Sequence, residues 1–253
     1  MVRPSLTLER RLMRAGAGSV VGLDEVGRGS LAGPVSVGAV RVLPATPSAP
    51  TGLRDSKLLS AEQRDRLHGR LVRWAPAWAV GHASPEEIDV LGMTAALRLA
   101  AVRAMVQLDG GIDAILLDGS YDWLGSTAEG LPEFPGSRQV EVRVKADQHC
   151  SSVAAASVLA KVERDRIITD LADPDDRYGW RSNKGYAAPE HLAALRTHGP
   201  TSLHRLSWQL PGVALDGLEA LDPQRRRIWR RLADGEQLLM LQPHEEAAAE
   251  PGW

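Results

Sequence analysis

Two short apolar stretches rich in valine, residues 19–23 and 35–42, enclose a glycine-rich segment at residues 27–33. Stretches of this length and composition are typical of β-strands, and a cluster of glycines between them is typical of a tight connection. Strands joined by so short a link pair antiparallel in one sheet. We therefore expect a strand, a glycine loop and a second strand here, and the rest of the fold must be built around that pair.

Further strands and helices are predicted along the chain. Serine at positions 60 and 84 is followed three residues later by glutamine or glutamate, which is the form of a capping box, and a helix should start at each. The second helix has proline at its first position and keeps a helical spacing of apolar residues until Gly110 and Gly111 end it. The other expected elements are strands at residues 77–81, 114–117 and 140–144 and helices at residues 151–168, 189–198 and 225–232.

Strands and helices are interspersed, so the predicted fold class is α/β. The first three strands should pair antiparallel, while the two later strands, each beside a long helix, suit parallel crossovers. The result would be a mixed five-stranded sheet flanked by helices. A length of 253 residues suits one large domain with an appendage. We divide it into an N-terminal segment at residues 1–17, a main domain at residues 18–211, and a C-terminal helical extension at residues 212–253 with an expected disordered tail.

Composition limits the class of function. The chain has 30 basic and 32 acidic side chains, which excludes a histone-like protein that holds nucleic acid by overall charge but not a local basic groove. Cys150 is the only cysteine, so neither an internal disulfide nor a thiolate zinc cluster can form. No apolar run has the length of a membrane span, and the N-terminal residues lack a signal-peptide pattern, so we expect a cytoplasmic protein.

Acidic residues mark the ends of three predicted strands: Asp24 with Glu25, Asp118, and Asp147. Because the carboxyl ends of parallel strands are where functional groups meet in α/β sheets, these side chains should share one site. Packed carboxylates repel one another unless a divalent cation compensates them, and oxygen ligands favour magnesium or manganese over zinc. Two such ions could activate water and stabilise the leaving oxygen of a phosphodiester.

Two alternatives concern this region. Neighbouring strand residues point to opposite faces, so Asp24 and Glu25 cannot both reach one ion from a regular strand. Either the strand ends at Glu25 or that residue also offers its backbone carbonyl.

A rival interpretation takes residues 27–33 as a loosened dinucleotide fingerprint of an oxidoreductase. The strand-like residues 34–40 argue against it, because a fingerprint is followed by a helix that holds the pyrophosphate.

Several motifs in a fixed order, spanning about residues 18–207, together resemble bacterial ribonuclease HII. They are Gly22-Leu-Asp24-Glu25-Val-Gly27-Arg28-Gly29, Asp55-Ser56-Lys57, Leu117-Asp118-Gly119, Lys145-Ala-Asp147, Val153-Ala-Ala-Ala-Ser157, Ala160-Lys161-Val-Glu-Arg164-Asp165, Lys184-Gly185-Tyr186 and His204-Arg205-Leu-Ser207. The resemblance implies a ribonuclease H-like fold and a metal-dependent endonuclease that cuts the RNA strand of RNA–DNA hybrids. It also implies incision 5′ of a single ribonucleotide embedded in duplex DNA, leaving a 3′-hydroxyl and a 5′-phosphate, with manganese or magnesium as cofactor.

The resemblance also assigns roles to residues of this chain. The catalytic, metal-binding carboxylates would be Asp24, Glu25, Asp118 and Asp147. The substrate would be contacted by a glycine loop, a junction-sensing tyrosine and basic residues, namely Gly27, Arg28, Gly29, Tyr186, Lys57, Lys184 and Arg205, with Lys161 and Arg164 as further candidates. The loop glycines would let the backbone approach the ribose and its 2′-hydroxyl. Each basic residue could neutralise a phosphate, although solvation or pairing within the protein is a common fate of such residues.

Some features lie outside the resemblance or depart from it. Ala188 stands where the family usually has threonine or serine; if this position caps the next helix, the loss should cost about 1 kcal/mol. Residues 225–231 hold five arginines and a tryptophan, which could either follow a nucleic-acid backbone or pack as a solvated helix.

We expect a monomer whose partner is an RNA–DNA hybrid or ribonucleotide-containing duplex DNA. A hybrid-binding protein with a vestigial metal site is the non-enzymatic alternative.

Overall fold

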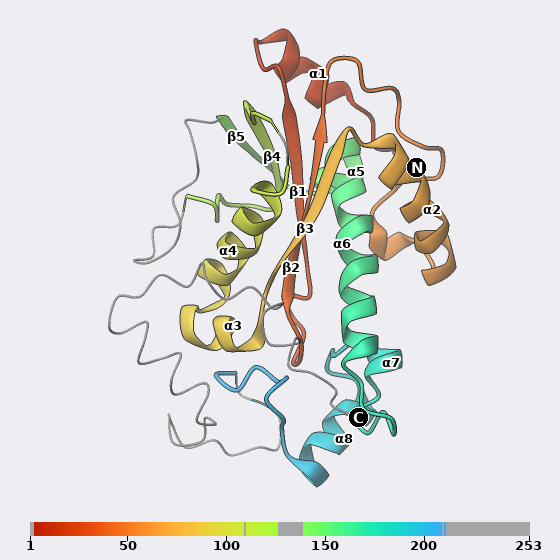
Figure 1. The fold of residues 1–253 in the computed structure, drawn as a ribbon, viewed down its shortest axis with the longest axis vertical. Helices are drawn as coiled ribbons and strands as arrows, with labels where there is room; N and C mark the ends of the chain where they lie inside the picture. Colours follow the sequence, from red (N-terminus) through yellow and green to blue (C-terminus); the bar gives the residue numbers. More distant parts are fainter. Residues whose placement is uncertain (1–2, 109, 126–138, 209, 211–253) are drawn as a thin grey trace, which may run out of the picture.

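The computed structural model describes residues 3–108, 110–125, 139–208 and 210. Their centre is a five-stranded sheet in the order β3-β2-β1-β4-β5 (Figure 1). The strands are β1 Val20–Val26, β2 Val35–Val42, β3 Ala77–Ala83, β4 Ala114–Asp118 and β5 Gln139–Arg143. All the predicted strands are present, and β1 and β3 extend further toward their C-terminal ends than predicted.

The pairing of the strands confirms the predicted mixed sheet. β2 pairs antiparallel with both β1 and β3, whereas β4 pairs parallel with β1 and β5. The glycine loop after β1 leads into β2 and not into a helix. The dinucleotide fingerprint is therefore wrong, because no helix N-terminus follows that loop to hold a pyrophosphate.

The helices are α1 Thr7–Arg14, α2 Ala61–Trp74, α3 Pro85–Leu91, α4 Met93–Met105, α5 Ala146–His149, α6 Ser151–Asp170, α7 Trp180–Asn183 and α8 Pro189–His198, with a 3₁₀ turn η1 at Ser56–Leu58. Both predicted capping boxes form, so α2 and α3 begin directly after Ser60 and Ser84. The long helix predicted after Ser84 is divided, because Gly92 lies between α3 and α4 with a φ of 75° that a helix cannot contain.

Helices pack on both faces of the sheet. α6 covers β1 and β2 on one face, and α4 covers β2 and β3 on the other (Figure 1). Small residues allow these close approaches: a side chain at Gly38 would collide with the carbonyl oxygen of Ala156 on α6, and one at Gly81 with that of Ala100 on α4. Two apolar cores result, one between the sheet and α6 and the other between the sheet and α4.

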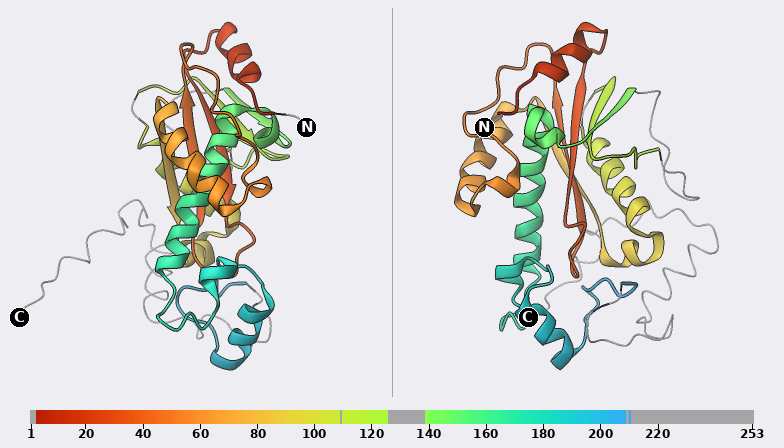
Figure 2. Two further views of the ribbon diagram at one scale, coloured as in Figure 1. Left: turned by 90° about the vertical axis from the view of Figure 1, so that its right-hand side faces the viewer. Right: turned by 180° about the vertical axis from the view of Figure 1, so that it is seen from behind.

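The N-terminal helix α1, which was not predicted, packs onto the α6 side of the domain. Leu8 and Leu12 enter the core there, and the buried Glu9 carboxylate accepts hydrogen bonds from the amide and hydroxyl of Ser152 at 2.9 and 2.8 Å. α1 lies at one end of the molecule, and α7 and α8 lie at the other (Figure 2). The predicted helix at residues 225–232 falls outside the described residues. Among the helices that are described, none has the length and apolar character needed to cross a membrane.

The glycine contacts under α6 lead to a stability prediction. Gly38→Ala should lower the free energy of unfolding by about 1–3 kcal/mol, because the added methyl must displace the α6 backbone. Gly111→Ala is the matched control, since open space surrounds that position. Urea denaturation of both variants measures the difference. Equal losses of unfolding free energy would show that the close packing of α6 on the sheet does not limit the size of the side chain at position 38.

Candidate active site

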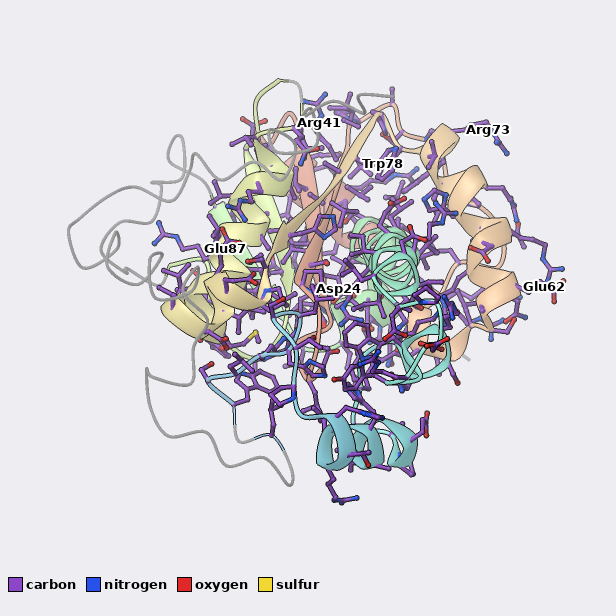
Figure 3. All side chains as sticks on the ribbon, turned by 60° about the horizontal axis from the view of Figure 1, so that its bottom comes forward. Asp24, Arg41, Glu62, Arg73, Trp78 and Glu87 are labelled. Carbon is purple, nitrogen blue, oxygen red and sulfur yellow. The ribbon has the colours of Figure 1, made fainter. Side chains whose placement is uncertain are left out.

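Two of the predicted carboxylates lie side by side near the C-terminal ends of β1 and β4. The parallel register pairs Leu23 with Leu117, so the next residues, Asp24 and Asp118, are neighbours on the two strands. Leu23 and Leu117 belong to the core on the α4 face, so by strand alternation the two aspartates face α6. Asp24 is only 5% exposed and lies deep in the molecule, between the sheet and the helices (Figure 3).

Asp147 reaches the same region from the short helix α5. Lys145, which precedes α5, takes a left-handed conformation with φ 58°, and this turns the chain directly after β5. The Ala146 amide then donates to Asp118 Oδ1 at 2.6 Å, which ties the start of α5 to the end of β4. The predicted convergence of three strand-end acids is therefore present, with the third acid on a helical turn.

Glu25 lies on the opposite side of β1 from Asp24. β1 continues to Val26 with regular pairing to β2, so the alternative that the strand ends at Glu25 is wrong. Glu25 Oε1 lies 3.7 Å from Arg28 Nη1, and Oε2 is buried without a hydrogen-bond partner. A buried carboxylate oxygen left without a donor is suited to a cation.

Burial and mutual repulsion raise the pKa of all four carboxyl groups. Burial has the largest effect on Asp24, and Glu25, Asp118 and Asp147 add to it, so that its pKa lies well above the ordinary value. Burial together with Asp118 and Asp55 raises the pKa of Asp147 to about 6. The pKa values of Glu25 and Asp118 are also raised, mainly by burial. The four groups therefore belong to one electrostatic cluster.

The cluster is not a closed cage around one point. Among the residues that the structure describes, no three histidine, cysteine, aspartate or glutamate side chains are close enough together to enclose a metal ion. Nevertheless, the donor set consists of carboxylate oxygens, one of them unpartnered, at sites where burial and repulsion penalise negative charge. These properties fit divalent cations with a preference for oxygen, such as magnesium and manganese.

Lys57 supplies positive charge to this cluster from the η1 turn. Burial opposes its charge, but Asp24, Asp55, Asp147 and Glu25 outweigh that effect and raise its pKa. Asp55 is buried, and its Oδ1 accepts from the Lys57 amide at 2.9 Å. Asp55 was not predicted as a site residue, although its place two residues before Lys57 in a recognised motif was a signal. Ser157, which hydrogen-bonds to Asp24, was missed in the same way.

The glycine loop after β1 is held from inside the protein by two arginines. Arg205 is fully buried, and its guanidinium donates to the carbonyls of Gly27 and Arg28 at 2.6 and 2.8 Å. Arg164, also fully buried, donates to the Ser30 hydroxyl at 2.7 Å, and a side chain at Gly27 would collide with it. The donors of both arginines are used within the protein, which favours the alternative of internal pairing over direct phosphate contacts.

Tyr186 and Lys184 lie between α7 and α8. Tyr186 is partly exposed, and the Lys161 ammonium and Arg164 guanidinium lie 5.5 and 5.4 Å from the centre of its ring. Lys184 Nζ donates to Thr169 Oγ1 and to the Arg181 carbonyl, both at 2.7 Å. Lys184 is thus engaged inside the protein, whereas Lys57 and Arg28 remain exposed.

Cys150 carries no signature of a nucleophile. Its side chain is buried, and burial raises the pKa of the thiol to about 12. The thiolate would therefore be scarce at neutral pH.

The chain is similar in sequence to known ribonucleases. The family model of ribonuclease HII matches residues 21–210. A ribonuclease HII of Streptomyces avermitilis is 48% identical over 235 residues, which cover 92% of this chain and 92% of the relative.

Two solved structures share the fold. The ribonuclease H2 from Pyrococcus horikoshii OT3 has a TM-score of 0.59 at 24% identity, covering 85% of this chain and 99% of that one. Bst-RNase HIII, solved in complex with Mn²⁺, has a TM-score of 0.56 at 21% identity, covering 87% of this chain and 72% of that one.

The family match and the close relative identify an endoribonuclease, a hydrolase that acts on nucleic acid with divalent metal ions. The four carboxylates, the glycine loop and the tyrosine all lie within the matched residues. The chain belongs to the ribonuclease HII family.

Proposed function

We propose that this protein hydrolyses the RNA strand of RNA–DNA hybrids and incises duplex DNA on the 5′ side of a single embedded ribonucleotide, leaving a 3′-hydroxyl and a 5′-phosphate. The observation that carries the proposal is the carboxylate cluster: Asp24 and Asp118 are neighbours on one face, and Asp147 interacts electrostatically with Asp118. Such a cluster is costly to bury unless cations occupy it.

In this proposal Asp24, Asp118, Asp147 and Glu25 hold two divalent ions, either manganese or magnesium. When bound, the ions supply activated water and charge stabilisation for the leaving oxygen. The Glu25 carbonyl is a further candidate ligand, since its side chain lies on the other face of β1. Lys57 is positioned to neutralise a substrate phosphate, because its ammonium already lies in the field of these carboxylates.

The glycine loop and Tyr186 are proposed to recognise the sugar of the ribonucleotide and its neighbour. The backbone of Gly27, Arg28 and Gly29 is proposed to approach the 2′-hydroxyl of the ribonucleotide, which distinguishes RNA from DNA. Gly27 has a φ of 82°, and Gly29 has open space beside its Cα, so the loop can come close to a ligand. Tyr186 is proposed to pack its ring on the neighbouring sugar. The protein would act as a cytoplasmic monomer, with residues 18–211 as its catalytic domain.

The direct test of this function is nicking of a DNA duplex that carries one ribonucleotide. Incision on its 5′ side should occur with magnesium or manganese and stop with a chelator. The alternative, a hybrid-binding protein with a vestigial site, predicts binding without nicking under all three conditions.

Replacing Asp118 should separate catalysis from folding. Asp118→Asn keeps the shape and the acceptor for the Ala146 amide but removes a charge from the cluster, so the nicking rate should fall by about 10³-fold or more. Thermal unfolding should change little. Asp175→Asn, at an exposed aspartate, is the control. Nicking at the control's rate would mean that Asp118 is not a metal ligand.

Metal affinity should depend on pH in a defined direction. The raised pKa of Asp147, about 6, means that this carboxyl takes up a proton as the pH falls through that value, and the proton competes with the metal. Calorimetric titration with Mn²⁺ should therefore give weaker binding at about pH 5 than at about pH 7.5. Equal affinities would show that Asp147 is not in the metal site.

Arg205 should act on substrate binding through the loop. Arg205→Lys keeps the charge but cannot reach the Gly27, Arg28 and Gly33 carbonyls together, so KM should rise about tenfold with an unchanged salt dependence. Lys57→Met, which removes an exposed cation, should instead reduce the salt slope of binding by about one. A reduced salt slope of substrate binding in Arg205→Lys would show that Arg205 contacts a phosphate directly.

A further inference from the structure

Two fully buried histidines lie in a small core beneath Tyr186. His191 on α8 and His204 are both 0% exposed, and their Nε2 atoms lie 3.1 Å apart. The rings of Tyr178 and Trp180 pack around the pair. Two buried imidazoles in contact are compatible only with protonation states that place one hydrogen between them.

The hydrogen-bond partners decide those protonation states. The Thr201 amide can only donate, and it donates to His204 Nδ1 at 2.9 Å, so the hydrogen of neutral His204 is on Nε2. The Tyr186 carbonyl can only accept, and it lies 2.9 Å from His191 Nδ1, so that nitrogen carries the hydrogen. His191 Nε2 is left to accept from His204 and, at 3.3 Å, from the Trp180 indole.

The direction of this relay runs from the Thr201 amide to the Tyr186 carbonyl. These contacts fit two neutral imidazoles. A second hydrogen on His191, at Nε2, would point at the Nε2 hydrogen of His204 and break their contact, and one on His204 Nδ1 would point at the Thr201 amide. Burial lowers the pKa of His191, against the raising effects of the Tyr186 carbonyl and the Glu190 carboxylate. Tyr178, the other titratable group packed on the pair, donates its hydroxyl hydrogen to the Gly199 carbonyl. Burial and the hydrogen-bond partners of its ring therefore both favour the neutral form of His191.

His191 supplies a side-chain contact to the Tyr186 backbone at the start of α8, in addition to the bond from the Tyr186 amide to the Asn183 carbonyl. Ala188 is the N-cap residue of α8 and makes no side-chain cap. The Tyr186 carbonyl accepts instead from the Ala188 amide at 2.8 Å and from His191. His191 thus ties the segment that carries the tyrosine to the buried core.

The same core is joined to the glycine loop. The Gly185 carbonyl accepts from the Leu31 amide at 2.9 Å, and the Gly33 amide donates to the Leu203 carbonyl at 2.8 Å. His204 also forms an antiparallel bridge with Ala32. Backbone hydrogen bonds and one β-bridge therefore link the segment next to Tyr186, the glycine loop and the segment around His204.

We propose that His191 and His204 are positioning residues for substrate recognition, which hold the Tyr186 backbone in register with the glycine loop through a one-directional relay of neutral imidazoles. This inference rests on the proposed function, because it takes the Tyr186 ring as the contact to the sugar beside the ribonucleotide. The pair itself touches no substrate.

Two amide substitutions separate the relay from simple packing. His191→Asn places an N–H donor near the position of Nδ1 and should keep the bond to Tyr186. His191→Gln places its amide near Nε2 and should lose that bond. For a duplex with one ribonucleotide, His191→Gln should raise KM about tenfold with kcat nearly unchanged, whereas His191→Asn, which keeps the bond to Tyr186 but gives up the contact to His204, should raise KM by clearly less. His198→Gln, on the same helix but exposed, is the matched control.

The outcomes are distinguishable. If both His191 variants match the control, or if both raise KM equally, the relay is wrong. NMR correlation of the imidazole nitrogens gives a readout without activity: hydrogens on His191 Nδ1 and His204 Nε2 support the proposal, and any other pair of tautomers overturns it. Tyr186→Ala is measured in parallel. If it leaves KM unchanged, the proposed role of the tyrosine has failed; if it raises KM while His191→Gln does not, only the positioning role has failed.

Discussion

The structure is organised around the burial of like charges at the ends of two parallel strands. Asp24 and Asp118 are placed as neighbours by the register of β1 and β4, and the turn after β5 adds Asp147. Such a cluster destabilises a protein without cations, since burial and repulsion both raise the pKa values of its members. The fold keeps the cluster by packing α6 tightly against the sheet, which gives the strand ends a fixed support for metal binding.

Positive charge around the site is divided between two roles. Lys57 is exposed and lies in the field of the carboxylates, which is why we propose it as the contact for a substrate phosphate. Arg164 and Arg205 are fully buried and donate to loop carbonyls and a hydroxyl. A planar guanidinium can bond several carbonyl groups at once, which an ammonium does less well. The buried arginines therefore shape the loop, and the exposed lysine is left for the ligand.

Sequence patterns predicted the local structure best where one residue has one physical role. Ser60 and Ser84 start helices because their hydroxyls satisfy free amides, and the strands around the glycine loop follow from valine-rich runs. The division at Gly92 was missed because apolar spacing continues through it. The sequence left the role of Arg205 open, because a basic residue near a nuclease motif has the same sequence pattern whether it binds a phosphate or a carbonyl.

The sequence by itself determined the family and the mixed sheet and selected four candidate carboxylates, because ordered motifs and strand periodicity are local properties of the chain. The tertiary structure decided that Asp24 and Asp118 lie on the face of the sheet covered by α6, while Glu25 lies on the opposite face. The face to which a side chain points depends on where its strand ends and how that strand pairs. It also decided which basic residues are buried and that His191 and His204 meet in one core. Those properties depend on partners far apart in the chain, which no local pattern records.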